Sequence, residues 1–359
     1  MSTTKRTTTG AAMPSVQTGG FRILKNRSAL PTSVTAAIQS VRVEDEINIP
    51  TMFSFTLNIV SSGGAWQDVN LDIFKPGDEI TVFLGLDSLQ QMVSAEITAI
   101  EPHFSDYSTA TIRGFDRMYW LKFGTRTRTY LNLDDNEIVS QVARAAGLTV
   151  KLPGSPAMVN DYVLQNNSSD YDFLMRRCAQ LNYELLMDDT TLVFRPSAEG
   201  ESPVKTMNYP TDISDLKLSL KLPTMGKQVT VKGYDITSNK VLTAVASSGS
   251  SQDKMGGKES GYQLAQAFPD SDIQLERPDL STPEALQAIA NAQYKRNLNQ
   301  FIEGSTSVLG DPDMVAGVNV KLSGLSQRFN GIYYITSSVH SYDVNEGYQT
   351  EFKLRRTGV

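Results

Sequence analysis

Side chains that commonly perform catalysis or bind metals are scarce in this chain of 359 residues. It has two histidines, His103 and His340, and one cysteine, Cys178. Two histidines so far apart and a single cysteine cannot supply a zinc site of the usual spacing. Each histidine ends an alternating strand pattern, so we expect both to hydrogen-bond to a turn. Cys178 falls on the apolar side of a predicted short helix, which is typical of an inert core thiol.

The other motifs for catalysis or ligand binding are weak as well. No G-x-S-x-G sequence is present, and residues 255–258 lack the spacing of a phosphate-binding loop. The acidic stretches at 311–313 and 188–189 lack the ligand register of a calcium loop, so we interpret them as solvated turns. A glycosidase pair of carboxylates cannot be recognised in a sequence, because it is defined in space. We therefore predict no catalytic residue, no cofactor-binding residue, no metal ligand and no cofactor, and hence a protein that is not an enzyme.

The composition is that of a globular protein, with 40% hydrophobic and 20% charged residues. A formal net charge of -6 argues against a dedicated nucleic-acid-binding protein, which normally has a basic face. Residues 122–130 mix basic and aromatic side chains and could contact nucleic acid or an acidic neighbour, but a solvated strand face fits the acidic balance better. No stretch approaches the roughly 18 apolar residues of a membrane span, and residues 1–20 lack the apolar core of a signal peptide. We expect neither stable nucleic-acid binding nor a membrane anchor.

Hydrophobic alternation with a period of two dominates the chain from Phe21 to about Thr125. It is clearest at residues 52–57, 79–84, 93–97 and 110–113. Several short strands at close spacing predict an antiparallel sandwich or barrel. The same pattern returns from Asp212 and resumes near Ser305, so we expect a second antiparallel β unit.

Between the two β regions the pattern becomes helical. Asp134 and Glu137 have the spacing of a capping box, and Gly147 supplies a C-terminal stop. A second short helix begins near Ser169, and residues 183–194 then predict a hairpin. These elements predict a small α/β module.

A longer helix interrupts the second β region. Residues 247–257 have the composition of a loop or linker and precede it. Thr282 is the predicted cap and Pro283 takes the first helical position. An apolar stripe follows at Ala285, Leu286, Ile289 and Ala290.

The two β regions resemble each other. A Gly-bounded strand at 77–85 corresponds to one at 317–324, and each is followed by an alternating strand that ends near a histidine. The next strand ends at Arg113 in the first region and at Arg355 in the second. These matches favour an internal duplication that puts the two histidines at equivalent sites. The alternative is that any two antiparallel meanders with Gly-bounded strands look alike.

We predict a mainly β protein with α+β elements. It contains two similar antiparallel β-barrels, a small α/β module between them and a helical insertion in the second barrel. The expected boundaries are a flexible N-terminal arm at 1–20, a first barrel at 21–130, the α/β module at 131–205, a second barrel at 206–246 and 304–359, and the insertion at 247–303.

Several segments also have a familiar order and spacing. They are a helix at 133–147, a polar stretch leading into a helix at 166–177, the hairpin at 183–194, a strand at 231–235, and closing strands at 317–322, 330–335 and 339–340. Together they resemble the late control protein D family of phage tails, which is related to the tail-hub half of the VgrG spike proteins of type VI secretion. The resemblance covers roughly residues 21–356.

The resemblance implies a structural baseplate hub of a contractile phage tail or a phage-tail-like injection particle. Family members form homotrimers in which two barrels per chain make a pseudo-sixfold ring that joins a trimeric spike to the hexameric tail tube. The chain stops at Val359, so we expect the spike to be a separate protein. The implied partners are further copies of this chain, that spike, tail tube proteins and other baseplate proteins. The implied location is the virion tail or injection-particle baseplate, after synthesis in the bacterial cytoplasm.

Two other functions stay open on the sequence alone. One is a tail-associated cell-wall-degrading enzyme, whose carboxylates the sequence cannot pair. The other is a carbohydrate- or receptor-binding β module, which would cluster exposed aromatic side chains on one face.

Overall fold

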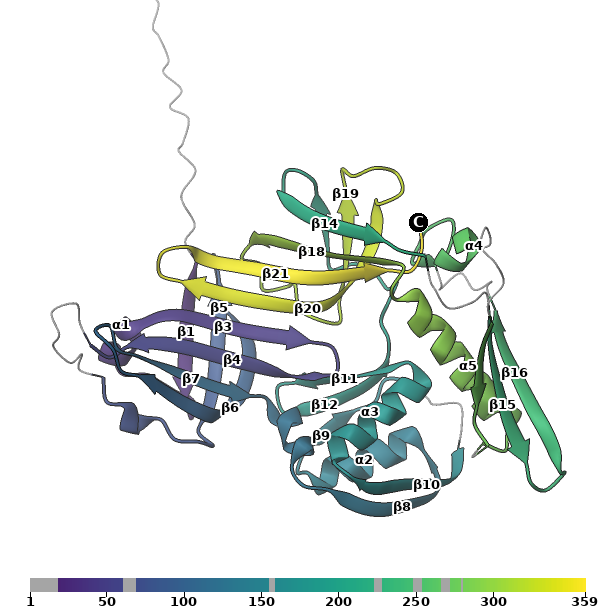
Figure 1. The fold of residues 1–359 in the computed structure, drawn as a ribbon. Coiled ribbons are helices and arrows are strands. Elements are labelled where there is room, and N and C mark those ends of the chain that lie inside the picture. The colour runs from purple at the N-terminus through teal and green to yellow at the C-terminus, as the bar shows by residue number, and fades with distance from the viewer. Residues whose placement is uncertain are drawn as a thin grey trace, which may run out of the picture.

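The chain folds into packed units that are built mainly of β-strands (Figure 1). The computed structural model describes residues 19–60, 69–154, 159–222, 228–247, 254–265, 272–278 and 280–359. The predicted arm at 1–20 lies outside the described residues, apart from its last two. The prediction of a mainly β fold with a few helices is confirmed. In the described part of the chain no helix is long and apolar enough to cross a membrane.

The first barrel is one half of a large sheet. Its elements are β1 (Gly20–Lys25), β2 (Ser28–Ala29), α1 (Thr32–Ala37), β3 (Ile38–Glu46), β4 (Ile49–Asn58), η1 (Leu71–Ile73), β5 (Glu79–Gly85), β6 (Gln90–His103) and β7 (Thr109–Phe115). The strand order is β3-β4-β7-β6-β5-β1-β2. Alternate residues of β4, namely Phe53, Phe55 and Leu57, are buried. The distant strands β1 and β3 contribute Ile23 and Val43 to the same core, so the sheet curls around that core.

The second barrel is the other half of the sheet. Its strands are β13 (Lys205–Asn208), β14 (Asp215–Leu220), β18 (Ile302–Leu309), β19 (Asn319–Ser323), β20 (Gly331–Asp343) and β21 (Gly347–Arg356). They lie in the order β14-β18-β21-β20-β19-β13. Met207 from one end of this order and Leu218 from the other pack in one core, so this half curls as well.

The two barrels share their strand order when β3, β4, β7, β6, β5 and β1 are matched with β14, β18, β21, β20, β19 and β13. The Gly77 N–H donates to the Ile97 C=O at 2.8 Å, and the Gly317 N–H donates to the Ile335 C=O at 2.9 Å. Both glycines have a positive φ, of 90° and 87°. A β-bulge follows each isoleucine. Such details are not shared by arbitrary meanders, so they support the predicted duplication.

The matched bulges correct the predicted equivalence of the histidines. Counted from the bulges, His340 corresponds to Pro102, and His103 corresponds to Ser341. A shift of one residue moves a side chain to the opposite face of a strand. His340 is accordingly buried, whereas His103 is exposed at the end of β6.

The α/β module lies between the two barrels in the sequence and has a hydrophobic core of its own. Its elements are η2 (Arg117–Lys122), β8 (Arg126–Asp134), α2 (Asp135–Ala145), β9 (Thr149–Lys151), β10 (Val159–Ser168), α3 (Asp170–Leu181), β11 (Tyr183–Asp188) and β12 (Thr191–Pro196). The predicted capping box is confirmed, because Asp134 and Glu137 each accept the other's backbone N–H, at 2.8 and 3.0 Å. The second helix begins near Ser169 as predicted, and the Ser169 hydroxyl caps α3 by accepting the Asp172 N–H at 3.0 Å.

The insertion is larger than the sequence predicted. It contains β15 (Gln228–Asp235), β16 (Lys240–Ser247), α4 (Gly261–Ala265), β17 (Asp272–Glu276) and α5 (Pro283–Leu298). The prediction placed residues up to 246 in the second barrel, but β15 pairs with β16 and β17 in a separate sheet. The reason is burial, because Val229 and Val231 pack with Leu286 of α5 in one core. Figure 1 shows this unit standing beside the second barrel, with α5 against its sheet.

A strand pair joins the barrels into one continuous sheet. The first part of β20 pairs with β19, and its second part, Ser337 to Asp343, pairs antiparallel with β3. The end of the β20–β21 hairpin also enters the first barrel, where Tyr348 belongs to the core. Figure 1 shows this long hairpin lying along the first barrel.

Alanine at the two matched glycines should have unequal costs. At Gly77 a Cβ atom meets nothing within 4 Å, so Gly77→Ala should lower the free energy of unfolding by about 1–2 kcal/mol through backbone strain alone. At Gly317 a Cβ atom would also lie 2.6 Å from a guanidinium nitrogen of Arg195, so Gly317→Ala should cost about 1–2 kcal/mol more. Denaturant unfolding of both variants measures the difference. Equal losses of stability would contradict the close contact between a Cβ atom at Gly317 and the Arg195 guanidinium.

Candidate functional site

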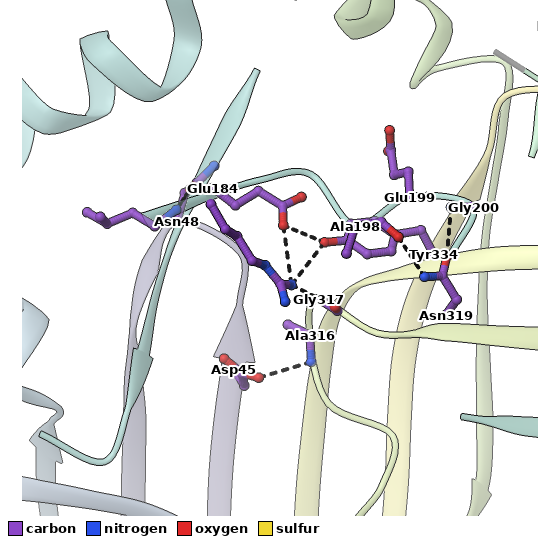
Figure 2. Close-up of polar contacts among 12 residues, drawn as sticks. Asp45, Asn48, Glu184, Ala198, Glu199, Gly200, Ala316, Gly317, Asn319 and Tyr334 are labelled. Atoms are coloured by element: carbon purple, nitrogen blue, oxygen red, sulfur yellow. Dashed lines mark hydrogen bonds and ion pairs between the residues drawn. The ribbon is translucent and has the colours of Figure 1, made fainter. Parts of the chain in front are cut away.

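The first barrel, the α/β module and the second barrel meet at buried polar contacts that we call the three-way junction (Figure 2). The β3–β4 turn, the β11–β12 hairpin and the segment around β19 and β20 each contribute side chains. The junction comprises Asp45, Asn48, Glu184, Arg195, Ala316, Gly317, Asn319, Tyr334 and the linker 198–200.

Asn48 holds the first barrel against the module. Its side-chain Oδ1 accepts the Leu185 N–H at 2.7 Å, and its own N–H donates to the Leu185 C=O at 3.2 Å. The Tyr171 hydroxyl donates to the Asn48 C=O at 2.7 Å. Asn48 has a φ of 68°, a left-handed conformation that asparagine tolerates better than most residues. This conformation presents its side chain and backbone to β11 together.

Glu184 and Tyr334 hold the module against the second barrel. The Tyr334 hydroxyl donates to Glu184 Oε2 at 2.5 Å. The Arg195 guanidinium lies 3.4 Å from the same oxygen and donates to the Gly317 C=O at 2.7 Å. Glu184 is only 3% exposed, and burial raises its pKa, although its hydrogen bonds and Arg195 act in the opposite direction.

The linker that leaves β12 is fixed by Asn319 of β19. The Asn319 amide donates to the Ala198 C=O at 2.7 Å, and its Oδ1 accepts the Gly200 N–H at 3.1 Å. Glu199 forms an ion pair with Arg355 of β21. These bonds orient the module on the second barrel through its own connecting segment.

Asp45 joins the two barrels directly, beside a second carboxyl group. Asp45 Oδ2 accepts the Ala316 N–H at 3.0 Å, and its Oδ1 accepts the Thr51 hydroxyl at 3.3 Å. Asp116 accepts the Thr51 N–H at 2.8 Å. Burial raises the pKa of both carboxyl groups to about 6, and the charge of Asp45 contributes to the shift of Asp116.

These contacts can hold three units in one orientation, and they fit a reaction centre poorly. A raised pKa at Glu184 would suit a general acid, and Glu184 lines a cavity of about 250 Å³ together with Glu46. However, Tyr334 and Arg195 already occupy one of its oxygens, and structural networks also shift pKa values. No group of three or more His, Cys, Asp or Glu among the described residues could hold a metal ion.

The histidines and the cysteine lie outside this hydrogen-bond network. His340 Nδ1 lies 2.8 Å from the Tyr348 hydroxyl and 3.2 Å from the Thr350 hydroxyl, and burial lowers the pKa of His340 to about 4. Cys178 is buried in the module core, where burial raises its pKa well above the usual range of a thiol. The predicted core position of Cys178 is confirmed, and its low reactivity stays a prediction. His103 is exposed in the other barrel.

The acidic and basic stretches of the sequence differ in their exposure to solvent. The prediction of a solvated turn at 311–313 is wrong for Asp311, which is buried and accepts from Lys205 Nζ at 2.6 Å. The turn at 188–189 is exposed, as predicted. In the basic stretch Arg126 is exposed, whereas Arg128 pairs with Asp170 at 3.3 Å.

Sequence reasoning missed the three-way junction because its partners are far apart along the chain. Ala316 and Asp45 are 271 positions apart, and Tyr334 and Glu184 are 150 apart. Asn48 does carry a local signal, since asparagine is favoured in turns with a positive φ.

The fold is similar to that of phage tail proteins of known structure. A 43 kDa tail protein of prophage MuSo2 from Shewanella oneidensis matches with a TM-score of 0.71 at 11% identity, over 94% of this chain and 98% of that chain. A tail protein from Neisseria meningitidis matches with a TM-score of 0.70 at 12% identity, over 94% and 96%. An Escherichia coli protein described as a component of the type VI secretion system, with structural similarity to T4 bacteriophage tail proteins, matches with a TM-score of 0.62 at 12% identity, over 94% and 77%.

The chain belongs to the family described as the Alg8 N-terminal domain, whose model matches residues 15–344. No curated protein matches it. At such low identities the solved structures establish a tail-hub-like fold, and the family description gives the name of a domain only.

Two substitutions of Asn48 should separate the contribution of its side-chain hydrogen bond from that of its left-handed backbone conformation. Asn48→Gly keeps the left-handed backbone accessible but loses the bond to the Leu185 N–H, so it should lower the free energy of unfolding by about 1–2 kcal/mol. Asn48→Ala adds backbone strain of about 1 kcal/mol. Denaturant unfolding compares the two variants. Equal stability of the two variants would contradict the expected backbone strain of alanine at this left-handed position.

Asp45 should give the protein a dependence of stability on pH. Its pKa is raised in the folded state, so its contribution to stability is full below the unfolded pKa near 4 and is lost as pH rises through about 6. Asp45→Asn can still accept from Ala316 and donate to Thr51, but it does not titrate. Between pH 5 and pH 8 the wild-type free energy of unfolding should fall by about 1–2 kcal/mol more than that of the variant. Parallel curves would contradict this role.

Proposed function

We propose that this chain is a structural baseplate hub of a contractile phage tail or a phage-tail-like injection particle. In this proposal three copies form a ring of six similar barrels. The ring joins a trimeric spike to a hexameric tail tube and contacts other baseplate proteins. In this proposal the chain has the architecture of the late control protein D hubs and acts in the assembled tail or particle.

The duplication of the barrel is the observation that carries this proposal. The two copies share strand order, a glycine with positive φ and a bulge at the same place. A homotrimer of single barrels offers three equivalent binding positions to a hexameric tube, whereas a homotrimer of duplicated barrels offers six similar ones. A duplicated barrel is therefore suited to the contact between threefold and sixfold parts.

The three-way junction supports the same proposal. A hub transmits load between its neighbours, so its units should be held by many directional bonds. Asn48, Glu184 and Asn319 supply such bonds between units that are distant in sequence. The function lies in interfaces, and we propose that the chain has no catalytic activity or cofactor.

The mass of the purified chain tests the assembly. We expect a trimer of the 39.5 kDa chain in native mass spectrometry or light scattering, alone or after addition of its spike. A chain that stays monomeric at high micromolar concentration with the spike present would overturn the proposal.

A cell-wall assay tests the enzymatic alternative. Purified peptidoglycan should not be hydrolysed by the wild type above the rate of a heat-inactivated control. Hydrolysis that disappears in Glu184→Gln but persists in Asp188→Asn, an exposed carboxyl outside the junction, would overturn the structural proposal.

A further inference from the structure

We propose that a cleft between the end of α5 and the outer face of the second barrel binds an oxyanion of the carboxylate or phosphate type. We call this surface the α5 cleft. The inference goes beyond the proposed function and does not depend on the oligomeric state, because the α5 cleft is formed within one copy of the chain.

The α5 cleft has an excess of positive charge. It has a volume of about 790 Å³ and lies where α5 ends and β18 begins, with β14 and β21 beside β18 (Figure 1). The cationic side chains that line it are Lys217, Arg296, Lys353 and Arg355, and Glu303 is the one carboxylate among its described lining residues. The whole chain has a net charge of -6, so this positive charge is local. A basic cleft on an acidic protein attracts anions.

Arg296, in the last turn of α5, lacks a counter-charge. Its guanidinium is partly buried, and its Nη2 group donates to Gln293 Oε1. Its Nε atom is buried without a hydrogen-bond partner, and no carboxylate among the described residues forms an ion pair with it. Burial lowers the pKa of Arg296 below its usual value, because it disfavours the charged form. An oxyanion in the α5 cleft would stabilise this desolvated cation.

Other arginines of this chain show what Arg296 is missing. Buried charges in proteins are normally paired. Five partly or fully buried arginines form ion pairs with carboxylates, namely Arg117, Arg128, Arg177, Arg195 and Arg355. Arg356 instead donates to the backbone C=O groups of Arg328 and Asn330. Arg296 has neither arrangement in the described part of the chain.

Two lysines complete the α5 cleft from the sheet. Lys217 of β14 and Lys353 of β21 both lie opposite Ser305 of β18, and all three side chains are exposed. Neighbouring strands are about 4.8 Å apart, so the two lysine backbones are separated by roughly 10 Å. Neither lysine forms an ion pair with a described carboxylate, and Glu303 pairs with Lys221 at 3.0 Å. An oxyanion above Ser305 would therefore lie between two unpaired ammonium groups.

The donors of the α5 cleft select the chemistry of the ligand. A guanidinium presents forked N–H donors that match the oxygens of a carboxylate or a phosphate, and lysine and serine add further donors. Farther along β18 from α5, Asp215 and Glu351 flank Ser307 and end the basic surface. A ligand with one or a few oxyanion groups fits this short surface, whereas a long polyanion such as a nucleic acid would meet the two carboxylates.

Binding of an acidic peptide tests the inference. The probe is a fluorescein-labelled peptide of six glutamates, titrated with the full-length chain and followed by fluorescence anisotropy. Arg296→Gln should weaken binding about tenfold, because a hydrogen-bonded charge pair is lost. Lys353→Gln should weaken it about threefold, as expected for an exposed ion pair.

Matched variants outside the α5 cleft serve as controls. Arg126→Gln in the module and Lys232→Gln in the insertion each remove one exposed positive charge and should leave binding unchanged. If they weakened binding as much as Arg296→Gln and Lys353→Gln do, the peptide would respond to net charge alone and the inference would be overturned. Failure of the wild type to bind both the peptide and phosphate would also overturn it.

Inorganic phosphate separates the two sources of the oxyanion. Phosphate that displaces the peptide, at an ionic strength held constant with sodium chloride, supports a site for either kind of oxyanion. Peptide binding without displacement supports a site for the carboxylates of a protein partner. Binding of phosphate alone, lost in Arg296→Gln, supports a site for the free anion.

A further variant keeps the inference testable if Arg296→Gln does not fold. Lys217→Gln and Lys353→Gln are combined in one chain, since both side chains are exposed and substitution leaves the cores intact. Circular dichroism checks the fold of each variant. The double variant should bind the peptide about tenfold more weakly than the wild type. Unchanged binding by a folded double variant would overturn the inference.

Discussion

β3 belongs to the first barrel by its core side chains, yet its outer edge is hydrogen-bonded to β20 of the second barrel. Because a strand has only two edges, this pairing fixes the distance and angle between the barrels as firmly as the ladders inside them. It also fixes register, since a slip of one residue would turn Val41 and Val43 out of the first core. The β3–β4 turn is thereby delivered to the three-way junction in one position.

The junction then determines where the α/β module lies. Asn48, which binds Leu185, follows the end of β3, and Tyr334, which binds Glu184, lies on β20. The module is thus attached to both barrels by side-chain bonds that lie close to this strand pair. The buried ionisable groups contribute directional hydrogen bonds to this orientation.

Local signals predicted local structure well. The capping box at Asp134 and the cap at Thr282 depend on neighbours within four residues, so the sequence displays them. The duplication was recognisable from glycine and strand spacing, but a bulge shifted the two histidines by one position, which spacing alone cannot show. The boundary at 246 failed because alternation in β15 and β16 shows that one face is buried without showing which neighbour covers it. The three-way junction was invisible, since its partners are brought together only by the completed sheet.

The insertion occupies the connection between β14 and β18, which corresponds to the tight β3–β4 turn of the first barrel. The entropy of closing a loop grows only with the logarithm of its length, by about 0.6 kcal/mol for each doubling. A segment that folds on its own core, as residues around Val231 and Leu286 do, adds little further disorder to the barrel. The connection between β14 and β18 can therefore accept insertions of different length and sequence during evolution, while the hydrogen bonds between the two strands stay unchanged.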